Sequence, residues 1–188
     1  MFALLLVTLA TAKYAVVSNL DGSTAVYKFD QCYYMMLNNY VKFEENGDKV
    51  KGYVSNKCGN WVEQASASSG DIEIKSDLPD YYFVQYFYND ADNCEFGESD
   101  AHPLENLYPQ CTKITLVSTY SIKAEIKDKM ITLTPYNSED CTGDVYTAYT
   151  SVTYELEKCT SVNNMNYMFS EGAFEVFAFL ALFIAFLF

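Results

Sequence analysis

The sequence has no arginine, a single histidine, a single tryptophan and no N-x-S/T sequon in its 188 residues. All 12 basic residues are therefore lysines, so the paired hydrogen bonds that a guanidinium gives to phosphate or carboxylate are not available. With 25 acidic residues the formal net charge is −13, and such a chain repels phosphate backbones and anionic lipid headgroups. Nucleic-acid binding is thereby disfavoured, and the missing sequon predicts no N-glycosylation.

The motifs of common enzymes and metal sites are missing as well. The only histidine, His102, precedes Pro103 in an acidic stretch, with no serine or cysteine motif that marks an activated nucleophile. No C-x-x-C pair and no H-E-x-x-H pattern occurs, so no zinc site is expected. Residues 89–100 are rich in carboxylates and amides, but Cys94 stands where the EF-hand calcium loop needs an oxygen. We predict no metal, no cofactor and no catalytic residue, and expect His102 in an exposed loop.

Two apolar runs mark the ends of the sequence. Residues 1–12 are mostly apolar and close on Ala10, Thr11 and Ala12, which is the pattern of a cleavable signal peptide. Residues 173–188 are apolar except for Glu175, and they fall short of the roughly 20 residues that a spanning helix needs. Small residues, a short spacer and a hydrophobic terminus form the signal for a glycosylphosphatidylinositol (GPI) anchor, which replaces the tail. A single membrane span is the alternative for residues 173–188.

The GPI hypothesis also predicts where the lipid is attached. The residue should be small and lie about 8 to 12 residues before the tail, which favours Asn163, with Ser161, Asn164 and Ser170 as alternatives. Residues 160–172 are then expected to be a linker. This layout of the two ends resembles GPI-anchored surface proteins of single-celled eukaryotes. The resemblance covers the termini alone and implies secretion and display on the extracellular face of the plasma membrane.

Six cysteines lie between the two apolar runs, and an even number behind a signal peptide predicts three disulfides formed in an oxidising compartment. They fall into three couples, each closing a segment of about fifty residues: 13–58, 59–111 and 112–159. Pairing inside each segment is our prediction, and a cysteine passed from one segment to the next is the alternative. The predicted bonds are Cys32–Cys58, Cys94–Cys111 and Cys141–Cys159.

The three segments also resemble one another in sequence. Residues 13–18 (KYAVVS) match 113–118 (KITLVS), and 72–75 (IEIK) match 124–127 (AEIK). Self-similarity at a fixed period is typical of a triplicated structural unit. We therefore predict that residues 13–159 form a domain of three disulfide-braced repeats.

The hydrophobic pattern of these segments indicates β-strands. Apolar residues occupy alternate positions over 114–126, and Asp128 and Lys129 then turn the chain into another such run. Residues 81–88 and 145–156 have the same pattern, while 33–41 fits either a strand or a short helix. The predicted fold class is all-β and antiparallel, as an irregular sandwich or barrel, with a β-trefoil as the alternative.

Aromatic residues supply the only signal for function between the two ends, because the chain has 17 tyrosines and 13 phenylalanines. Exposed tyrosines give contact area at low entropic cost and suit protein or glycan recognition. We therefore expect a non-enzymatic cell-surface domain that binds a protein or carbohydrate partner or coats the surface. The alternative is a hydrolase that uses two carboxylates, which any chain this acidic could place close together.

Overall fold

The computed structural model describes residues 13–36, 39–64, 72–89, 92–96, 100–114, 120–162 and 165–172. The predicted signal peptide and hydrophobic tail lie outside these ranges. The described part is all-β, as predicted, and its strands form three sheets with antiparallel pairing except between β3 and β9. No helix in that part is long and apolar enough to cross a membrane.

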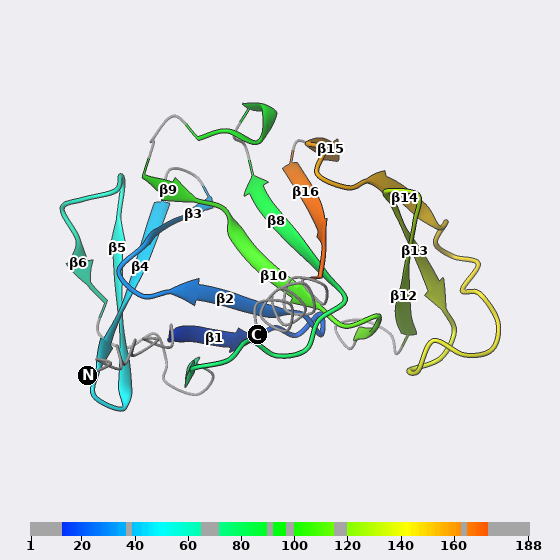
Figure 1. Cartoon of the computed structure of the whole chain (residues 1–188), viewed down its shortest axis with the longest axis horizontal. Helices are drawn as coiled ribbons and strands as arrows, with labels where there is room; N and C mark the ends of the chain where they lie inside the picture. The colour runs from blue at the N-terminus through cyan, green and yellow to red at the C-terminus, as the bar shows by residue number, and fades with distance from the viewer. Residues whose placement is uncertain are drawn as a thin grey trace, which may run out of the picture.

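The largest sheet spans the middle of the molecule (Figure 1). It has seven strands among the described residues, with β8 and β10 near its centre. In spatial order the strands are β15 (Thr160–Val162), β16 (Met165–Glu171), β8 (Phe83–Asn89), β10 (Leu104–Tyr108), β2 (Thr24–Lys28), β1 (Tyr14–Ser18) and β7 (Ile72–Lys75).

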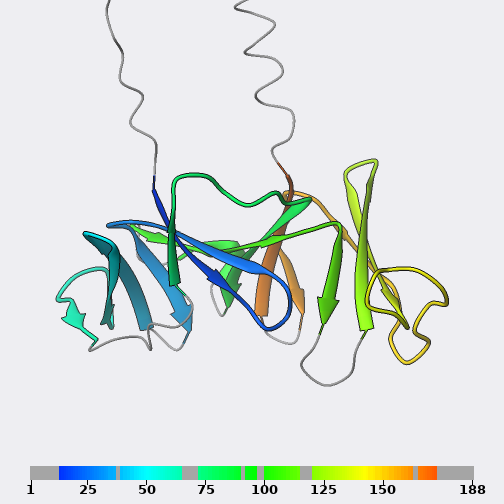
Figure 2. The ribbon, with the colours of Figure 1, turned by 90° about the horizontal axis from the view of Figure 1, so that it is seen from below.

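Two smaller sheets lie at opposite ends of the long axis (Figures 1 and 2). The five-stranded sheet has the order β6 (Val62–Glu63), β5 (Lys49–Ser55), β4 (Asn39–Asn46), β3 (Cys32–Met36) and β9 (Ala101–His102) within the described residues. The four-stranded sheet there has the order β11 (Cys111–Ile114), β12 (Tyr120–Lys127), β13 (Met130–Tyr136) and β14 (Val152–Glu155). A single helical turn, Asp92–Cys94, follows β8.

One face of the seven-stranded sheet packs against both smaller sheets. Ala25 and Tyr27 of β2 contact Tyr33 of the five-stranded sheet, which is almost fully buried. At the other end Phe83 and Phe169 pack with Ala124 and Ile131 of the four-stranded sheet. Because neighbouring residues of a strand point to opposite faces, the other face has a cluster of its own. There Val26, Val84 and Leu107 are buried, with Tyr14, Tyr81 and Tyr86 packed against them.

Some of the predicted runs of alternating apolar residues form strands, and others do not. Residues 120–127 form β12, which pairs with β13 through the turn at Asp128 and Lys129, two residues with positive φ. Of the ambiguous stretch 33–41, residues 33–36 belong to β3 and 39–41 to β4, which pair with each other, while 37–38 lie outside the described residues. Residues 145–156 differ from the prediction, because only Val152–Glu155 is a strand and the rest is a loop.

The six cysteines form three disulfides, but two of the predicted pairings were wrong. Cys32–Cys58 forms as expected. The others are Cys94–Cys159 and Cys111–Cys141, so cysteines are exchanged between the second and third segments. For Cys94–Cys159 the reason is strand pairing. Because β16 lies beside β8, Cys159, which precedes β15, comes next to Cys94 in the turn after β8. Segment boundaries in the sequence carry no information about that pairing.

The sheets do not confirm the threefold repeat. Residues 13–18 lie in and beside β1 of the seven-stranded sheet, whereas 113–114 end β11 of the four-stranded sheet. Strand β7, which matches 124–127, is an edge strand, but β12 has a neighbour on each side. The matched stretches thus share a strand pattern and not a structural position. Each sheet is open within the described residues, so they form neither a barrel nor the barrel-based β-trefoil.

The predicted linker 160–172 is folded, apart from residues 163–164, which lie outside the described part. Strands β15 and β16 fill 160–162 and 165–171, and β16 pairs with β8 from Asn166 to Glu171. The amide of Gly172 then donates to the carbonyl of Tyr82 at 2.9 Å. Residues 165–171 are therefore an integral strand of the sheet and not a spacer.

Candidate functional site

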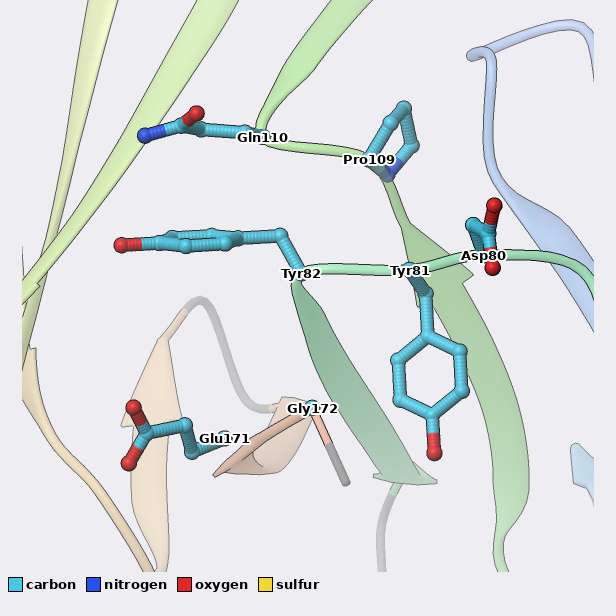
Figure 3. A pocket seen from close by; sticks show the side chains of 7 residues that line it. All are labelled: Asp80, Tyr81, Tyr82, Pro109, Gln110, Glu171 and Gly172. Atoms are coloured by element: carbon cyan, nitrogen blue, oxygen red, sulfur yellow. The ribbon is translucent and has the colours of Figure 1, made fainter. Parts of the chain in front are cut away.

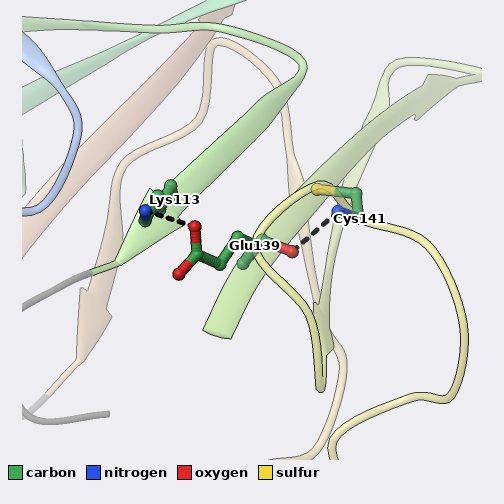
Figure 4. A network of polar contacts seen from close by, with 4 residues as sticks. Lys113, Glu139 and Cys141 are labelled. Atoms are coloured by element: carbon green, nitrogen blue, oxygen red, sulfur yellow. Dashed lines mark hydrogen bonds and ion pairs between the residues drawn. The ribbon is translucent and has the colours of Figure 1, made fainter. Parts of the chain in front are cut away.

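The loop at residues 137–151 joins β13 to β14 at the outer end of the four-stranded sheet (Figure 1). The Cys111–Cys141 disulfide ties it to the start of β11. The amide of Cys141 also donates to the hydroxyl oxygen of Ser121 at 2.9 Å, which satisfies a fully buried serine on β12. Figure 4 shows a third tie, in which the Glu139 carboxylate reaches the Lys113 ammonium of β11. These three ties hold the loop against the sheet.

Hydrogen bonds within the loop, and between the loop and β13, fix its shape further. The amide of Asn137 donates to the carbonyl of Asp144, and that of Tyr146 donates to the carbonyl of Pro135, both at 2.9 Å. The Asp140 carboxylate accepts from the hydroxyl of Thr142 at 2.7 Å. Hydrogen bonds from Thr142 and Ser138 lower the pKa of Asp140, so the carboxylate stays charged and keeps these bonds at neutral pH. Loops of this length are usually functional when they are ordered.

Tyr120, the first residue of β12, stacks on Tyr146 and Tyr149 of this loop, and the three are called the tyrosine cluster below. The ring centroid of Tyr120 lies 5.5 Å from that of Tyr146 and 5.7 Å from that of Tyr149. The centroids of Tyr146 and Tyr149 are 5.5 Å apart. Tyr149 is 57 % exposed, so the stack faces solvent. Burial, and then the other two tyrosines, raise the pKa of Tyr120, which keeps this phenol neutral and able to donate.

Sequence reasoning did not find the tyrosine cluster. The run 145–156 has alternating apolar residues, so Tyr146 was expected in a strand. In the structure the backbone there bonds within the loop, and Tyr146 and Tyr149, three residues apart, both face Tyr120. The available signal was the dense set of turn residues over 137–144, which includes Asn137, Asp140 and Gly143.

A separate hollow of about 340 Å³ lies at the end of β16 (Figure 3). It has two carboxylates in its lining, Asp80 and Glu171, which makes it a possible site for the hydrolase alternative. Figure 3 shows that these side chains point to different sides of the hollow, with Tyr81 and Tyr82 between them. The two carboxylates do not converge on a common point, as a glycoside hydrolase requires.

The half-buried carboxyl of Glu105 is not part of an acid pair either. Burial raises the pKa of Glu105, and the nearby charges of Lys28 and His102 lower it in part. The raised pKa therefore comes from desolvation and not from a second carboxylate. Among the described residues no group of three or more His, Cys, Asp or Glu side chains could hold a metal ion.

Replacing Glu105 should stabilise the domain at neutral pH. Because the pKa of Glu105 is raised, the folded state binds the proton more tightly than the unfolded chain does. The free energy of unfolding therefore falls as the pH rises through the titration of this carboxyl. The neutral variant Glu105→Gln should therefore unfold at higher urea concentration at pH 7. The gain should shrink below about pH 4, where the unfolded carboxyl is protonated too. The exposed Glu95→Gln is the control, and equal midpoints for Glu105→Gln and the unaltered domain at pH 7 would contradict the expectation.

The residues predicted from the sequence lie in separate places. His102 is exposed, as expected, but belongs to β9, with its ring 5.9 Å from that of Tyr33. Ser161 lies on β15 and Ser170 on β16, while Asn163 and Asn164 fall outside the described residues. Of the acidic stretch 89–100, only part is described. These residues lie on β9, β15 and β16, whereas the tyrosine cluster lies on β12 and the loop 137–151.

Comparison with known proteins leaves the assignment to the structure itself: no protein-family model matches the chain, and neither a curated protein nor a solved structure matches it.

Proposed function

We propose that this chain is a non-enzymatic recognition domain displayed on the outside of a cell, and that its tyrosine cluster binds a protein partner. The observation that carries the proposal is the cluster itself. Tyr120 of β12 stacks on both Tyr146 and Tyr149, which lie on a loop fixed by a disulfide, an ion pair and main-chain hydrogen bonds. Such an arrangement loses little entropy when it binds.

A protein partner suits this surface better than a charged polymer. Tyrosine rings are enriched in the buried centres of protein interfaces, because each combines apolar area with a hydroxyl. Around the cluster the loop exposes threonine hydroxyls, which can donate and accept at a polar rim. Those exposed threonines are Thr142, Thr147 and Thr150. The domain as a whole is acidic, which disfavours anionic partners.

The proposed location rests on the ends of the chain and on the cysteines. Three disulfides suit an oxidising exterior, in keeping with a signal peptide at 1–12. In Figure 2 the start of β1 and the end of β16 lie on the same side of the molecule. An anchor in the tail 173–188, by GPI or by a membrane span, would hold the domain by that side. The tyrosine cluster, at one end of the long axis, would remain accessible.

A photoreactive benzophenone side chain at Ala148 would test the proposal directly. Ala148 is exposed and lies between Tyr146 and Tyr149, so a protein bound to the cluster would be within its reach. On intact cells that produce the chain we expect a discrete protein adduct. Tyr149→Ala should reduce its yield at least about tenfold, since truncating a central aromatic costs 2 kcal/mol or more. A phosphatidylinositol-specific phospholipase should release the adduct if the anchor is GPI.

The control places the same benzophenone at Glu73, which is exposed on the edge strand β7 of the seven-stranded sheet and belongs to neither proposed site. The same adducts from both positions, or an adduct that Tyr149→Ala leaves unchanged, would contradict recognition by the tyrosine cluster. Retention of the adduct on phospholipase-treated cells would instead favour the membrane-span alternative for the tail.

A further inference from the structure

We infer that the five-stranded sheet carries a second site, which binds a single neutral hexopyranose residue of a glycan. The site is a polar hollow of about 280 Å³ around Trp61, called the Trp61 pocket below. It lies at the end of the long axis opposite the tyrosine cluster, beside β6 (Figure 1). The inference does not depend on the protein partner proposed above.

Part of the lining of the Trp61 pocket is apolar and fixed. The Cys32–Cys58 disulfide and the indole of Trp61 both line it, and they pack against buried Tyr34 and Tyr40. The ammonium of Lys42 lies 5.4 Å from the Trp61 ring centroid and 5.0 Å from that of Tyr53, so it holds the indole against β4 and β5. A pyranose presents one face of C–H groups, and a rigid aromatic surface complements that face.

The wall of the pocket carries hydrogen-bonding groups of both kinds. Asp30 and Asp100 supply carboxylate acceptors, and His102 adds a ring nitrogen. The hydroxyl of Tyr33 donates to Oε1 of Gln31 at 3.3 Å, which leaves the amide nitrogen of Gln31 to donate toward a ligand. Sugar hydroxyls both donate and accept, so acceptors beside an amide donor suit two neighbouring hydroxyls.

The backbone around the pocket is also held in an unusual conformation. Asp30 and Asn60 have φ of 62° and 50°, in the left-handed region that Asp and Asn adopt more readily than other non-glycine residues. The amide of Asp30 donates to the carbonyl of Phe43 at 2.9 Å, which fixes its position at the pocket.

The charges of the pocket define the class of sugar. Asp30 and Asp100 are negative, and the one cation, Lys42, is already paired with Glu44. A uronic acid would bring a third carboxylate close to two others, and it should be rejected. A hollow of about 280 Å³ is large enough for one pyranose ring. The ligand is therefore one neutral residue, at a glycan end or branch.

Because Trp61 is the only tryptophan, its fluorescence reports on this pocket alone. The probes are the methyl glycosides of glucose, galactose, mannose and N-acetylglucosamine, with methyl glucuronide and glycerol as comparisons. At least one neutral glycoside should give a saturable change in Trp61 fluorescence, with a Kd on the order of 1 mM. Asp100→Asn and Gln31→Ala should each weaken the binding about tenfold, since the first replaces a charged acceptor with a neutral one and the second removes an amide donor.

Two controls keep the test decisive. Asp144→Asn removes an exposed carboxylate at the other end of the molecule, and Tyr149→Ala alters only the tyrosine cluster, so both should leave glycoside binding unchanged. Absence of saturable binding by every neutral glycoside, confirmed by ligand-observed NMR, would overturn the inference. Tighter binding of methyl glucuronide than of the neutral glycosides would also overturn it, as would an Asp144→Asn variant that weakens glycoside binding as much as Asp100→Asn does. These outcomes are independent of the benzophenone adduct at Ala148.

Discussion

A chain that ends at Asn163 should lose cooperative unfolding, whereas a chain that ends at Gly172 should keep it. The shorter chain lacks β16, which lies between β15 and β8 in the seven-stranded sheet. It also loses Phe169, which is 3 % exposed and stacks on Tyr154 with ring centroids 4.8 Å apart. Truncating one such phenylalanine costs about 3 to 5 kcal/mol, a large part of the 5 to 15 kcal/mol that stabilises a typical domain.

Urea unfolding of residues 13–163 and 13–172, followed by circular dichroism, measures this difference. Within the longer chain, Phe169→Ala should lower the unfolding midpoint strongly. Met165→Ala is the matched control, because Met165 is on the same strand and exposed, and it should have little effect. Similar midpoints for the two chain lengths would show that β16 is dispensable.

The same strand bears on where a lipid could be attached. Attachment at Ser161, Asn163 or Asn164 would remove β16 together with the tail, and with it the buried contacts of Phe169. Attachment at Ser170 would remove only Glu171 and Gly172 from the described part. If the anchor is GPI, we therefore now favour Ser170 over Asn163. The sequence favoured Asn163 because its spacing from the tail fits the signal better.

Replacing both Cys94 and Cys159 with serine should lower the free energy of unfolding by about 4 kcal/mol. The bond joins residues 65 apart, the longest separation among the three disulfides, so its loss frees the unfolded chain most. It also connects the turn after β8 to the start of β15, beside the pairing of β8 with β16. Removing both cysteines avoids a free thiol. Urea unfolding of the double variant measures the loss.

The Cys32→Ser and Cys58→Ser pair is the comparison, because that bond closes only 26 residues and should cost somewhat less. A non-reducing peptide map tests the connectivity itself. It should contain a peptide that joins Cys94 to Cys159 and another that joins Cys111 to Cys141. A peptide joining Cys94 to Cys111 would contradict the structure and restore the sequential pairing.

Local patterns in the sequence determined the strands. Alternation of apolar residues over 114–126, with a turn at Asp128 and Lys129 and another such run after it, predicted strands that include β12 and β13, since a strand with one buried face requires that period. The even number of cysteines predicted that all six are bonded, because the count does not depend on how the chain folds. The all-β class and the three disulfides were therefore available from the residues themselves.

Only the tertiary structure decided which of these elements meet. Cys94 pairs with Cys159 because β16 lies beside β8, a contact between residues far apart in the chain that alternation cannot specify. Tyr120 meets Tyr149 because the loop folds back over β12, and the pocket around Trp61 forms where β3, β4 and β9 approach it. The sequence by itself determined the strands and the chemistry of the side chains. Long-range pairing determined both proposed sites, because each gathers residues from separate strands and loops.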